Sequence, residues 1–386
     1  MTNTFVNESL KKCIFEAKKN FMKAFLYVLC LLPIGLWAQE SQWNLYRGGP
    51  SLNGVATTEI PESFTIKWTF KAFDMIKSSP VFGGGLIFIG DQEGNLYALD
   101  ENGVKQWSFK TETSLEAAPM YLDGLIYIAS IEGIMFALDA QSGKEKWRFS
   151  TDGQISASAN WAYIAGTNNK QILFGSYDFF LYSLDAQSGA LLWKYETDNY
   201  INGAAAMDED LAIFGGCDGN LHVVNTDNGQ IDSKIEIGTY IASSAAIHQH
   251  QAYFGNYDGA FFKVDLLSKK VVWKQEQAGS YVGSPAVNEE MAIIGSQNRY
   301  VYAFNTENGA LAWKFKTLRK VESSPIIVKN KVIIASTDGR LYILDLQSGE
   351  KLWSYEIGSP IIGTPAVKDQ KIIVASQDGM VYCFGK

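Results

Sequence analysis

Short apolar runs alternate with turns rich in Gly, Asp and Ser over most of the sequence, and the pattern returns about every 40 positions. Within residues 321–355, four such runs follow one another, at Ser323–Val328, Lys331–Ser336, Arg340–Asp345 and Glu350–Tyr355. The runs have the length of strands, and the Gly residues between them supply the positive φ that tight turns need. The pattern therefore predicts a unit of four antiparallel strands that is repeated along the sequence.

A tryptophan marks the fourth strand of most repeats. The tryptophans are separated by 39, 40, 46, 80, 40 and 40 residues, and they are Trp68, Trp107, Trp147, Trp193, Trp273, Trp313 and Trp353. The gap of 80 is a double period, because Ser233 follows Gly229 by four residues just as Trp193 follows Gly189. The spacing of 46 places extra residues around 166–171, which lengthen one hairpin. Because an outer-strand indole buries a large area and can wedge between neighbouring sheets, we expect these tryptophans to dock blades rather than bind ligands.

The number of third strands defines the predicted architecture. They occur at Leu96, Met135, Leu181, Leu221, Phe261, Val301, Leu341 and Val381. No fourth strand follows the eighth of these before Lys386, whereas residues 64–70 form an unassigned strand at the other end of the repeats. Pairing the two would close the ring and remove two free sheet edges. The sequence thus predicts an all-β, eight-bladed β-propeller of four-stranded antiparallel blades, with the last blade closed by the N-terminal strand.

Residues 1–38 have the features of an export signal. The apolar run after Lys23 is too short to span a bilayer comfortably, and it ends on the small residue Ala38. We expect cleavage after Ala38, with an uncleaved membrane anchor as the alternative. The true start is either Met1 or Met22.

The mature protein divides into a lead-in segment, residues 39–63, and the propeller, residues 64–386. The repeats share one continuous core, so they count as a single domain, which we expect to be a monomer. The full sequence has a formal charge of −8, and residues 1–38 hold five Lys and two Glu, which leaves −11 on the remainder. An acidic body of this kind repels phosphate backbones, so nucleic acid is not an expected partner. We also expect no direct insertion into a membrane after cleavage.

Cysteine usage adds no site. Cys30 is preceded by Leu29, where a lipobox needs a small residue, so lipidation is not expected. Cys217 and Cys383 fall in the fourth and eighth repeats, across the ring from one another, and are too far apart to form a disulfide.

The repeats resemble the PQQ-like β-propellers. The motif Asp-x-x-Ser-Gly-x-x-x-Trp carries the resemblance, at Asp139–Trp147, Asp185–Trp193 and Asp345–Trp353. The segment Trp43–Pro50 is also similar to the lead-in of non-enzymatic bacterial members. The superfamily includes quinoprotein alcohol dehydrogenases and the BamB proteins of outer-membrane assembly, and the resemblance covers residues from about 43 to 386. It is specific for the superfamily and weak for any one function inside it.

The resemblance to the dehydrogenases implies a quinone held over a disulfide between adjacent cysteines, beside a calcium ligated by Glu, Asn and Asp. This sequence has no adjacent pair of cysteines, and its Asp and Asn residues recur at equivalent turn positions around the ring. His248 and His250 share one turn, but His222 belongs to another repeat, so a solvated turn is favoured over a metal site. We therefore expect no cofactor, no metal and no catalytic residues, and hence no enzymatic activity.

The loops that lead into the inner strands should collect around the axis, where propellers bind their partners. An aliphatic residue in each loop, such as Val282 in the sixth repeat, is expected to lie in the core. Tyr and Arg are enriched at interface hot spots, and the loops contain both. The candidate partner-binding residues are Tyr200, Asn202, Tyr240, Tyr281, Arg319, Lys320 and Glu322. The alternative is that they are ordinary exposed loop residues.

These observations favour an exported, non-catalytic propeller that acts as a protein-interaction scaffold in the cell envelope. The resemblance to BamB implies an envelope protein as the partner, with outer-membrane protein assembly as one role of that kind. The expected location is the periplasm or the exterior, with any attachment to the outer membrane made through the partner. Two alternatives stay open: a propeller that binds a small molecule or glycan at its axis through Tyr200, Tyr240 and Tyr281, and a PQQ-dependent oxidoreductase.

Overall fold

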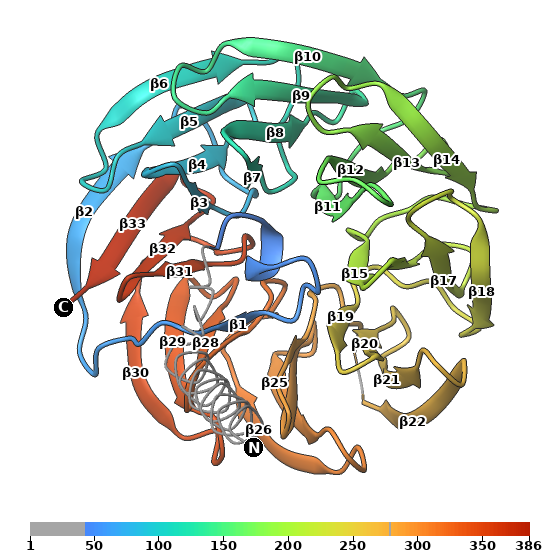
Figure 1. Cartoon of the computed structure of the whole chain (residues 1–386). Coiled ribbons are helices and arrows are strands. Elements are labelled where there is room, and N and C mark those ends of the chain that lie inside the picture. Colours follow the sequence, from blue (N-terminus) through green and yellow to red (C-terminus); the bar gives the residue numbers. More distant parts are fainter. Residues whose placement is uncertain (1–42, 278) are drawn as a thin grey trace, which may run out of the picture. The chain divides into compact units, whose positions relative to one another are not determined.

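The computed structural model describes residues 43–277 and 279–386, so the predicted signal segment lies outside the described residues. Eight antiparallel sheets are arranged in a ring, each sheet forming one blade (Figure 1). The predicted eight-bladed propeller is therefore confirmed. Among the described residues, no helix is long and apolar enough to cross a membrane.

Each blade runs from an inner strand near the axis to an outer strand at the rim. Blade 1 consists of β3 (Val81–Gly83), β4 (Leu86–Gly90), β5 (Asn95–Leu99) and β6 (Lys105–Lys110), and blade 2 of β7 (Met120–Leu122), β8 (Leu125–Ala129), β9 (Ile134–Asp139) and β10 (Glu145–Ser150). Blade 3 consists of β11 (Asn160–Tyr163), β12 (Lys170–Gly175), β13 (Phe180–Asp185) and β14 (Leu191–Glu196), and blade 4 of β15 (Ala206–Asp208), β16 (Leu211–Gly215), β17 (Asn220–Asn225) and β18 (Ile231–Glu236). Blade 5 consists of β19 (Ala246–His248), β20 (Gln251–Gly255), β21 (Ala260–Asp265) and β22 (Lys270–Glu276), and blade 6 of β23 (Ala286–Val287), β24 (Met291–Gly295), β25 (Tyr300–Asn305) and β26 (Leu311–Lys316). Blade 7 consists of β27 (Ile326–Val328), β28 (Lys331–Ala335), β29 (Arg340–Asp345) and β30 (Lys351–Glu356).

Blade 8 joins the two ends of the propeller. Its strands β31 (Ala366–Lys368), β32 (Lys371–Ala375) and β33 (Met380–Gly385) come from the C-terminus, and its outer strand is β2 (Thr65–Lys71). The register runs from Thr65 opposite Gly385 to Lys71 opposite Met380. The predicted closing strand is thus confirmed, one residue later than expected. Without this pairing, β33 would expose a free edge.

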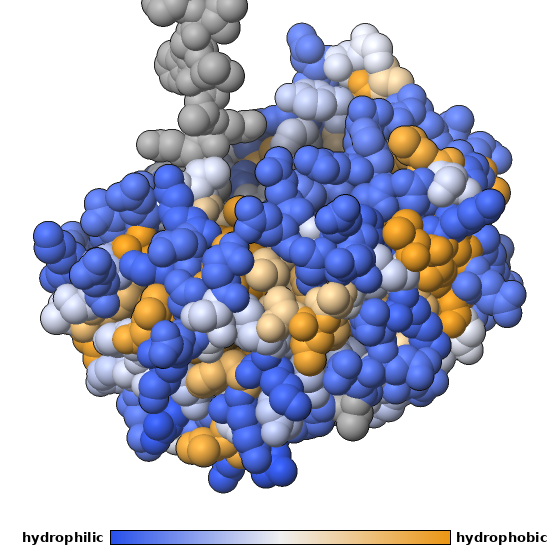
Figure 2. Space-filling model, turned by 90° about the horizontal axis from the view of Figure 1, so that it is seen from below, coloured by the Kyte–Doolittle hydropathy of each residue, from blue (hydrophilic) through white to orange (hydrophobic). Residues whose placement is uncertain are grey.

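Burial differs between the inner and outer parts of a blade. All five residues of β4 are buried, because neighbouring blades cover both faces of the middle strands. The outer strand β6 alternates between exposed and half-buried positions. Seen from one side, the ring is largely hydrophilic, with apolar residues in separate patches (Figure 2).

Trp313 in β26 shows how one blade docks to the next. Its indole N–H donates to the carbonyl oxygen of Leu346 in blade 7, at 2.8 Å. The ring lies over Gly349, where an added Cβ would come within 2.6 Å of the indole. Equivalent contacts with a carbonyl and a glycine of the following blade are made by Trp68, Trp107, Trp147, Trp193 and Trp273.

Blade 4 lacks this docking residue, and the change is matched in blade 5. Ser233 takes the place of the tryptophan and carries no ring that could cover the next blade. The turn residue of blade 5 that corresponds to the covered glycine is Lys269, with φ of 60°. The Lys269 ammonium lies 2.9 Å from a carboxylate oxygen of Asp232. A side chain is therefore accommodated where no indole covers the turn.

The part of the lead-in segment from Trp43 to Ala56 lies at the centre of the ring (Figure 1). It contains the short helix η1 (Tyr46–Gly48) and the strand β1 (Val55–Ala56), which pairs in parallel with β27. Its carbonyl groups accept amide hydrogens from the inner strands of six blades, in the pairs Phe82 with Trp43, Tyr121 with Asn44, Met207 with Pro50, Ile247 with Ser51, Val287 with Asn53 and Ile327 with Gly54. The segment therefore satisfies inner strand edges that would otherwise lack partners.

Arg47 anchors the lead-in segment. Its side chain is fully buried, and its guanidinium donates to the carbonyl oxygens of Pro285, at 2.6 Å, and Pro325, at 2.5 Å. Burial lowers the pKa of Arg47 to about 10. An added Cβ at Gly54 would overlap the guanidinium, so glycine is required there.

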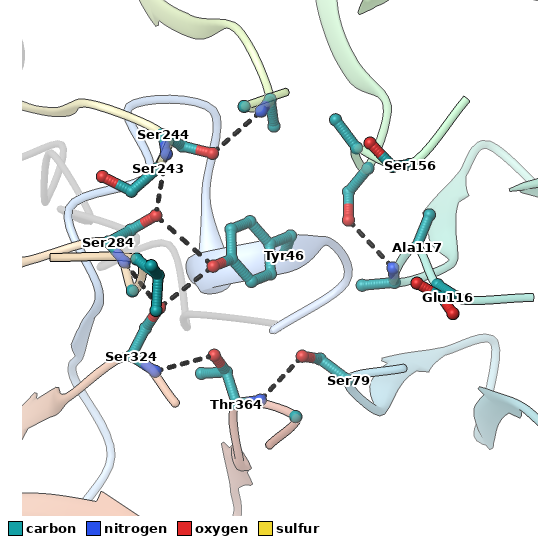
Figure 3. Close-up of a pocket in the computed structure, with 18 of the residues that line it drawn as sticks. Tyr46, Ser79, Glu116, Ala117, Ser156, Ser243, Ser244, Ser284, Ser324 and Thr364 are labelled. Carbon is teal, nitrogen blue, oxygen red and sulfur yellow. Dashed lines mark hydrogen bonds between the residues drawn. The ribbon is translucent and has the colours of Figure 1, made fainter. Parts of the chain in front are cut away.

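Side-chain hydroxyls link the inner ends of neighbouring blades around the axis (Figure 3). At six of the eight junctions a backbone amide donates to a hydroxyl of the next blade, in the pairs Ala118 with Ser158, Ala204 with Ser244, Ser244 with Ser284, Ser284 with Ser324, Ser324 with Thr364 and Thr364 with Ser79. At the remaining two junctions, between blades 1 and 2 and between blades 3 and 4, the hydroxyl residue is replaced by Ala118 and Ala204. There, Ser78 donates to Ala117 O and Asn160 donates to Ala205 O, each at 2.8 Å.

The turn between β21 and β22 is expected to make stability sensitive to acid. Asp265 accepts hydrogen bonds from Ser268 and Gln251, which lower its pKa to about 2. The folded pKa lies below the unfolded value of about 3.9, so the stabilisation is present above about pH 4 and is lost as the pH falls toward 2. We expect Asp265→Asn to flatten the fall in urea midpoint between about pH 5 and pH 2.5. Asn225 occupies the equivalent turn in blade 4, so the variant should fold, and an unchanged pH profile would contradict the assignment.

Candidate interaction face

Two sets of loops gather on one face of the ring, which we call the funnel face. One set leads into the inner strands, and the other joins the second and third strands of each blade. In every blade an amide of the second set donates to a carbonyl of the first, as from Gln92 to Met75 and from Gln377 to Pro360, both at 2.8 Å. The predicted partner-binding residues lie on the first set of loops or directly after it.

A polar cavity of about 180 Å³ lies at the axis of this face. Tyr46 lies in its wall, with its hydroxyl 3.0 Å from Ser324 Oγ and 3.4 Å from Ser284 Oγ (Figure 3). Most of the remaining wall is made of Ser, Ala and Gly from the segments that lead into the inner strands. The Lys77 ammonium at its rim pairs with Glu116 at 2.7 Å. The cavity therefore offers hydroxyl and backbone groups at its centre, and this charged pair at its rim is already neutralised.

Five aromatic side chains from blades 3 to 5 form a second feature of the funnel face, the aromatic patch. They are Tyr177, Phe179, Tyr200, Tyr240 and Tyr257. Tyr200 stacks on Tyr177 with ring centroids 4.8 Å apart and lies 5.3 Å from Phe179. Tyr240 stacks on Tyr257 at 4.7 Å. Tyr200, Phe179 and Tyr257 are 44%, 38% and 42% exposed, so the patch presents aromatic surface to solvent.

Two of the predicted tyrosines belong to this patch, but the third does not. Tyr281 is fully buried and packs against Phe261, so its expected place in a surface ring is wrong. It fills the core position that was expected for Val282, which is only half-buried. Gly255 leaves the space that the Tyr281 side chain occupies, because an added Cβ at Gly255 would lie 2.3 Å from the Cβ of Tyr281 and 2.7 Å from its ring. Counting the 40-residue period onward from Ile241 arrives at Tyr281, so this signal was present in the sequence.

Asn202 lies between the aromatic patch and the cavity. Its side-chain amide is 2.8 Å from the Cys217 sulfur, and Asn202 also lines the axial cavity. Burial raises the pKa of the Cys217 thiol. This thiol is therefore not activated as a nucleophile.

The predicted residues of blade 7 line a separate notch of about 590 Å³ at the junction of blades 6, 7 and 8. Arg319, Lys320 and Glu322 contribute to its wall. Lys320 pairs with Glu322 at 2.6 Å, whereas Arg319 is exposed. Apart from Asn202 and the buried Tyr281, the candidate residues thus fall into two groups on the funnel face rather than one.

Sequence analysis missed Tyr177, Phe179 and Tyr257 in the patch, and Arg299 in the notch. These residues lie on the loops between second and third strands, whereas the prediction concerned the loops before the inner strands. A signal existed for two of them, because Phe179 and Arg299 replace the glycine that ends this loop in the other six blades.

The histidines serve the fold. His222 is fully buried, with Nε2 2.9 Å from Asp218 and Nδ1 3.1 Å from the Tyr195 hydroxyl. Burial lowers the pKa of His222, so the ring is held neutral between these partners. His250 lies 2.9 Å from Asp208 on an exposed turn. Within residues 43–277 and 279–386, no three His, Cys, Asp or Glu side chains gather to hold one metal ion.

The cavity residues do not fit the quinone and calcium implied by the resemblance to dehydrogenases. The two carboxylates that line the cavity, Glu116 and Glu322, are each paired with a lysine. Of the described free cysteines, Cys217 lies in blade 4 and the fully buried Cys383 in blade 8. These residues therefore do not form a site for a quinone.

Two family models match the protein. One, described as the β-propeller of the beta-alanine-activating enzyme, matches residues 167–386, and one described as outer membrane protein assembly factor BamB matches residues 61–199. The protein therefore belongs to the PQQ-like β-propeller family. No curated protein sequence matches it significantly.

Solved structures share the fold at low sequence identity. BamB from Moraxella catarrhalis is 19% identical with a TM-score of 0.71, over 84% of this protein and 98% of that one. The computationally designed protein Ika8 is 17% identical with a TM-score of 0.71, over 82% and 98%. A europium-containing methanol dehydrogenase is 12% identical with a TM-score of 0.74, over 90% and 99%. These likenesses establish the fold and no particular activity.

Proposed function

We propose that the protein is a non-catalytic scaffold, exported to the cell envelope, that binds a protein partner through the aromatic patch of its funnel face. The patch is the observation that carries the proposal. Five aromatic rings from three consecutive blades form two clusters, with Tyr200 stacked on Tyr177 beside Phe179 and Tyr240 stacked on Tyr257, at positions where most of the other blades carry polar loops.

The patch has the properties of an interface anchor. Tyr and Phe bring large contact areas at a low cost in conformational entropy, because each side chain has only two rotatable bonds. Stacking fixes the rings further before any partner arrives, so less freedom is lost on binding. Aromatic side chains are also enriched among hot-spot residues.

The proposed location and the absence of catalysis have separate support. Residues 1–38 have the composition of an export signal, and one matching family model is described as an outer membrane protein assembly factor. The mismatch between the axial cavity and a quinone site favours a binding role over an oxidoreductase.

We expect the double variant Tyr200→Ala/Tyr240→Ala to lose its partner. The tagged protein, residues 39–386, would be captured from chemically crosslinked cell envelopes, and the proteins enriched with it would be identified by mass spectrometry. Removing two hot-spot rings should lower recovery of the partner by about tenfold or more, because each ring of this kind contributes more than ~1 kcal/mol.

The matched control is Leu191→Ala/Leu192→Ala on the outer strand of blade 3, where both side chains are exposed. Recovery should stay unchanged in this variant, and the melting temperatures of both variants should match that of the parent. The proposal fails if no envelope protein is enriched, or if both variants recover it equally.

The axial cavity supports a second candidate, the binding of a small polar molecule or glycan. Its hydroxyl-lined wall and its volume of about 180 Å³ suit a ligand of a few heavy atoms or one sugar group. A rise in melting temperature with one member of a panel of sugars, lost in Tyr46→Phe, would favour this function.

A further inference from the structure

The notch at the junction of blades 6, 7 and 8 combines an apolar wall with a cationic one. Leu318, Pro360 and Ile362 supply the apolar side, and Arg299 and Arg319 supply the charge. Leu318 is 65% exposed, so it presents apolar surface to solvent beside the two guanidinium groups. The notch opens on the funnel face, apart from the aromatic patch.

The two guanidinium groups are uncompensated. Within the described part of the protein, neither Arg299 nor Arg319 forms an ion pair or a side-chain hydrogen bond. Glu322, the carboxylate in the wall of the notch, is already shared between Lys320, at 2.6 Å, and the Gln297 amide, at 3.3 Å. Two positive charges are therefore left free in the notch of a body with a formal charge of −11.

Arg299 occupies a backbone position that disfavours a side chain. Its φ is 75°, and six of the eight blades place a glycine at the equivalent position. At two of these glycines, Gly94 and Gly259, an added Cβ would lie 2.4 Å from a carbonyl oxygen. Backbone strain of this kind persists at sites where the side chain is needed for function. Arg299 thus carries a long cationic side chain at a position where the backbone favours glycine.

One residue positions both arginines. The Thr317 amide donates to Arg299 O at 2.9 Å, and the Thr317 hydroxyl lies 3.0 Å from Arg299 O and 2.6 Å from Arg319 O. The two backbone segments come from adjacent blades and are thus held at a fixed separation. The two guanidinium groups consequently project from fixed points into one notch.

We propose that this notch binds a carboxylate of an acidic peptide segment in the protein partner, with an adjacent apolar residue of that segment against Leu318 and Pro360. Guanidinium groups match carboxylates in two-pronged geometry, and such charge-assisted hydrogen bonds are among the strong ones. The apolar wall favours a peptide over a free anion. The inference rests on the proposed function and names the chemistry of the partner segment. The carboxylate has two sources, an Asp or Glu side chain and the carboxyl terminus of a polypeptide.

Two peptide display libraries test this proposal on the protein of residues 39–386. One library presents random peptides internally, and the other presents them with a free C-terminus. We expect enrichment of Asp or Glu beside an apolar residue in the first if side chains supply the carboxylate, or enrichment in the second alone if polypeptide termini do. A fluorescein-labelled copy of the most enriched peptide should bind at least about tenfold more weakly to Arg299→Gly/Arg319→Ser. Raising the salt concentration from about 50 to 500 mM should also weaken the binding.

The variant is designed to fold. Arg299→Gly restores the residue found in six other blades, so its melting temperature should equal or exceed that of the parent. Lys270→Ser/Lys351→Ser removes the same charge from exposed positions on outer strands and should bind the peptide normally.

Absence of acidic peptides from both libraries, or equal binding by Arg299→Gly/Arg319→Ser, would overturn the inference. The proposed function is tested separately, because recovery of the partner depends on Tyr200 and Tyr240. If the tyrosine double variant loses the partner but neither library enriches acidic peptides, the scaffold proposal stands and only the proposal for the notch fails.

Discussion

Replacing Trp313 by alanine is expected to lower the free energy of unfolding by about 3–5 kcal/mol, the range seen for large aromatic side chains deleted from cores. The indole is buried between blades 6 and 7, donates to Leu346 O and covers Gly349. Its loss would open a cavity at a blade junction and leave a carbonyl without its donor. Because each blade contacts only its neighbours, weakening one junction weakens the closed ring.

Guanidinium chloride unfolding, followed by tryptophan fluorescence and circular dichroism, measures this change. Ser233→Ala is the matched control, since Ser233 occupies the same position in the outer strand of blade 4. The Ser233 hydroxyl has no hydrogen-bond partner among the described residues, so its removal should change stability by less than about 1 kcal/mol. A loss below about 1 kcal/mol in Trp313→Ala would show that the indole does not hold the junction.

Arg47→Ala is expected to lower the free energy of unfolding by roughly 2–6 kcal/mol, because two buried carbonyl oxygens lose their donor at a cost of about 1–3 kcal/mol each. The guanidinium is fully buried and satisfies the carbonyl oxygens of Pro285 and Pro325 in two neighbouring blades. Truncation would leave both oxygens without a donor and detach the lead-in segment from blades 6 and 7. Arg47→Lys should recover little, because one ammonium group cannot reproduce the two-pronged geometry.

Denaturant unfolding and limited proteolysis measure the two parts of this effect. The denaturant concentration at the midpoint of unfolding should fall. In limited proteolysis, cleavage within residues 43–56 should become faster than cleavage in the blades. Arg148→Ala is the control, since Arg148 is exposed and pairs with Glu145 three positions away, so its loss should cost at most about 1 kcal/mol. A variant that unfolds like the parent would rule out an anchoring role for Arg47.

The architecture could be predicted because its signals are local and recur. Each blade is encoded by turn glycines and strand-length apolar runs, and the 40-residue period repeats them eight times. Closure by residues 64–70 followed from counting strands, and the observed strand, Thr65–Lys71, differs by one residue. The error at Tyr281 arose from assigning the aliphatic Val282 to the core by residue type, whereas strict counting of the period gives the correct position.

The candidate site could be predicted only in part. Tyr200, Tyr240 and Arg319 were identified because they stand out within their own loops. Their neighbours Tyr177 and Tyr257 lie on the other set of loops, and a stack such as that of Tyr200 on Tyr177 joins residues of different blades.

By itself, the sequence determined the number of blades, the strand order within each blade and the tryptophan positions, because hydrophobic period and turn chemistry act between residues that are close in sequence. Only the tertiary structure decided which carbonyls of the lead-in segment meet which blade, and that Arg299 and Arg319 share one notch. Those relations depend on how far each blade is rotated about the axis when the ring closes. That rotation follows from the packing of whole sheets against one another, and no local sequence pattern encodes it.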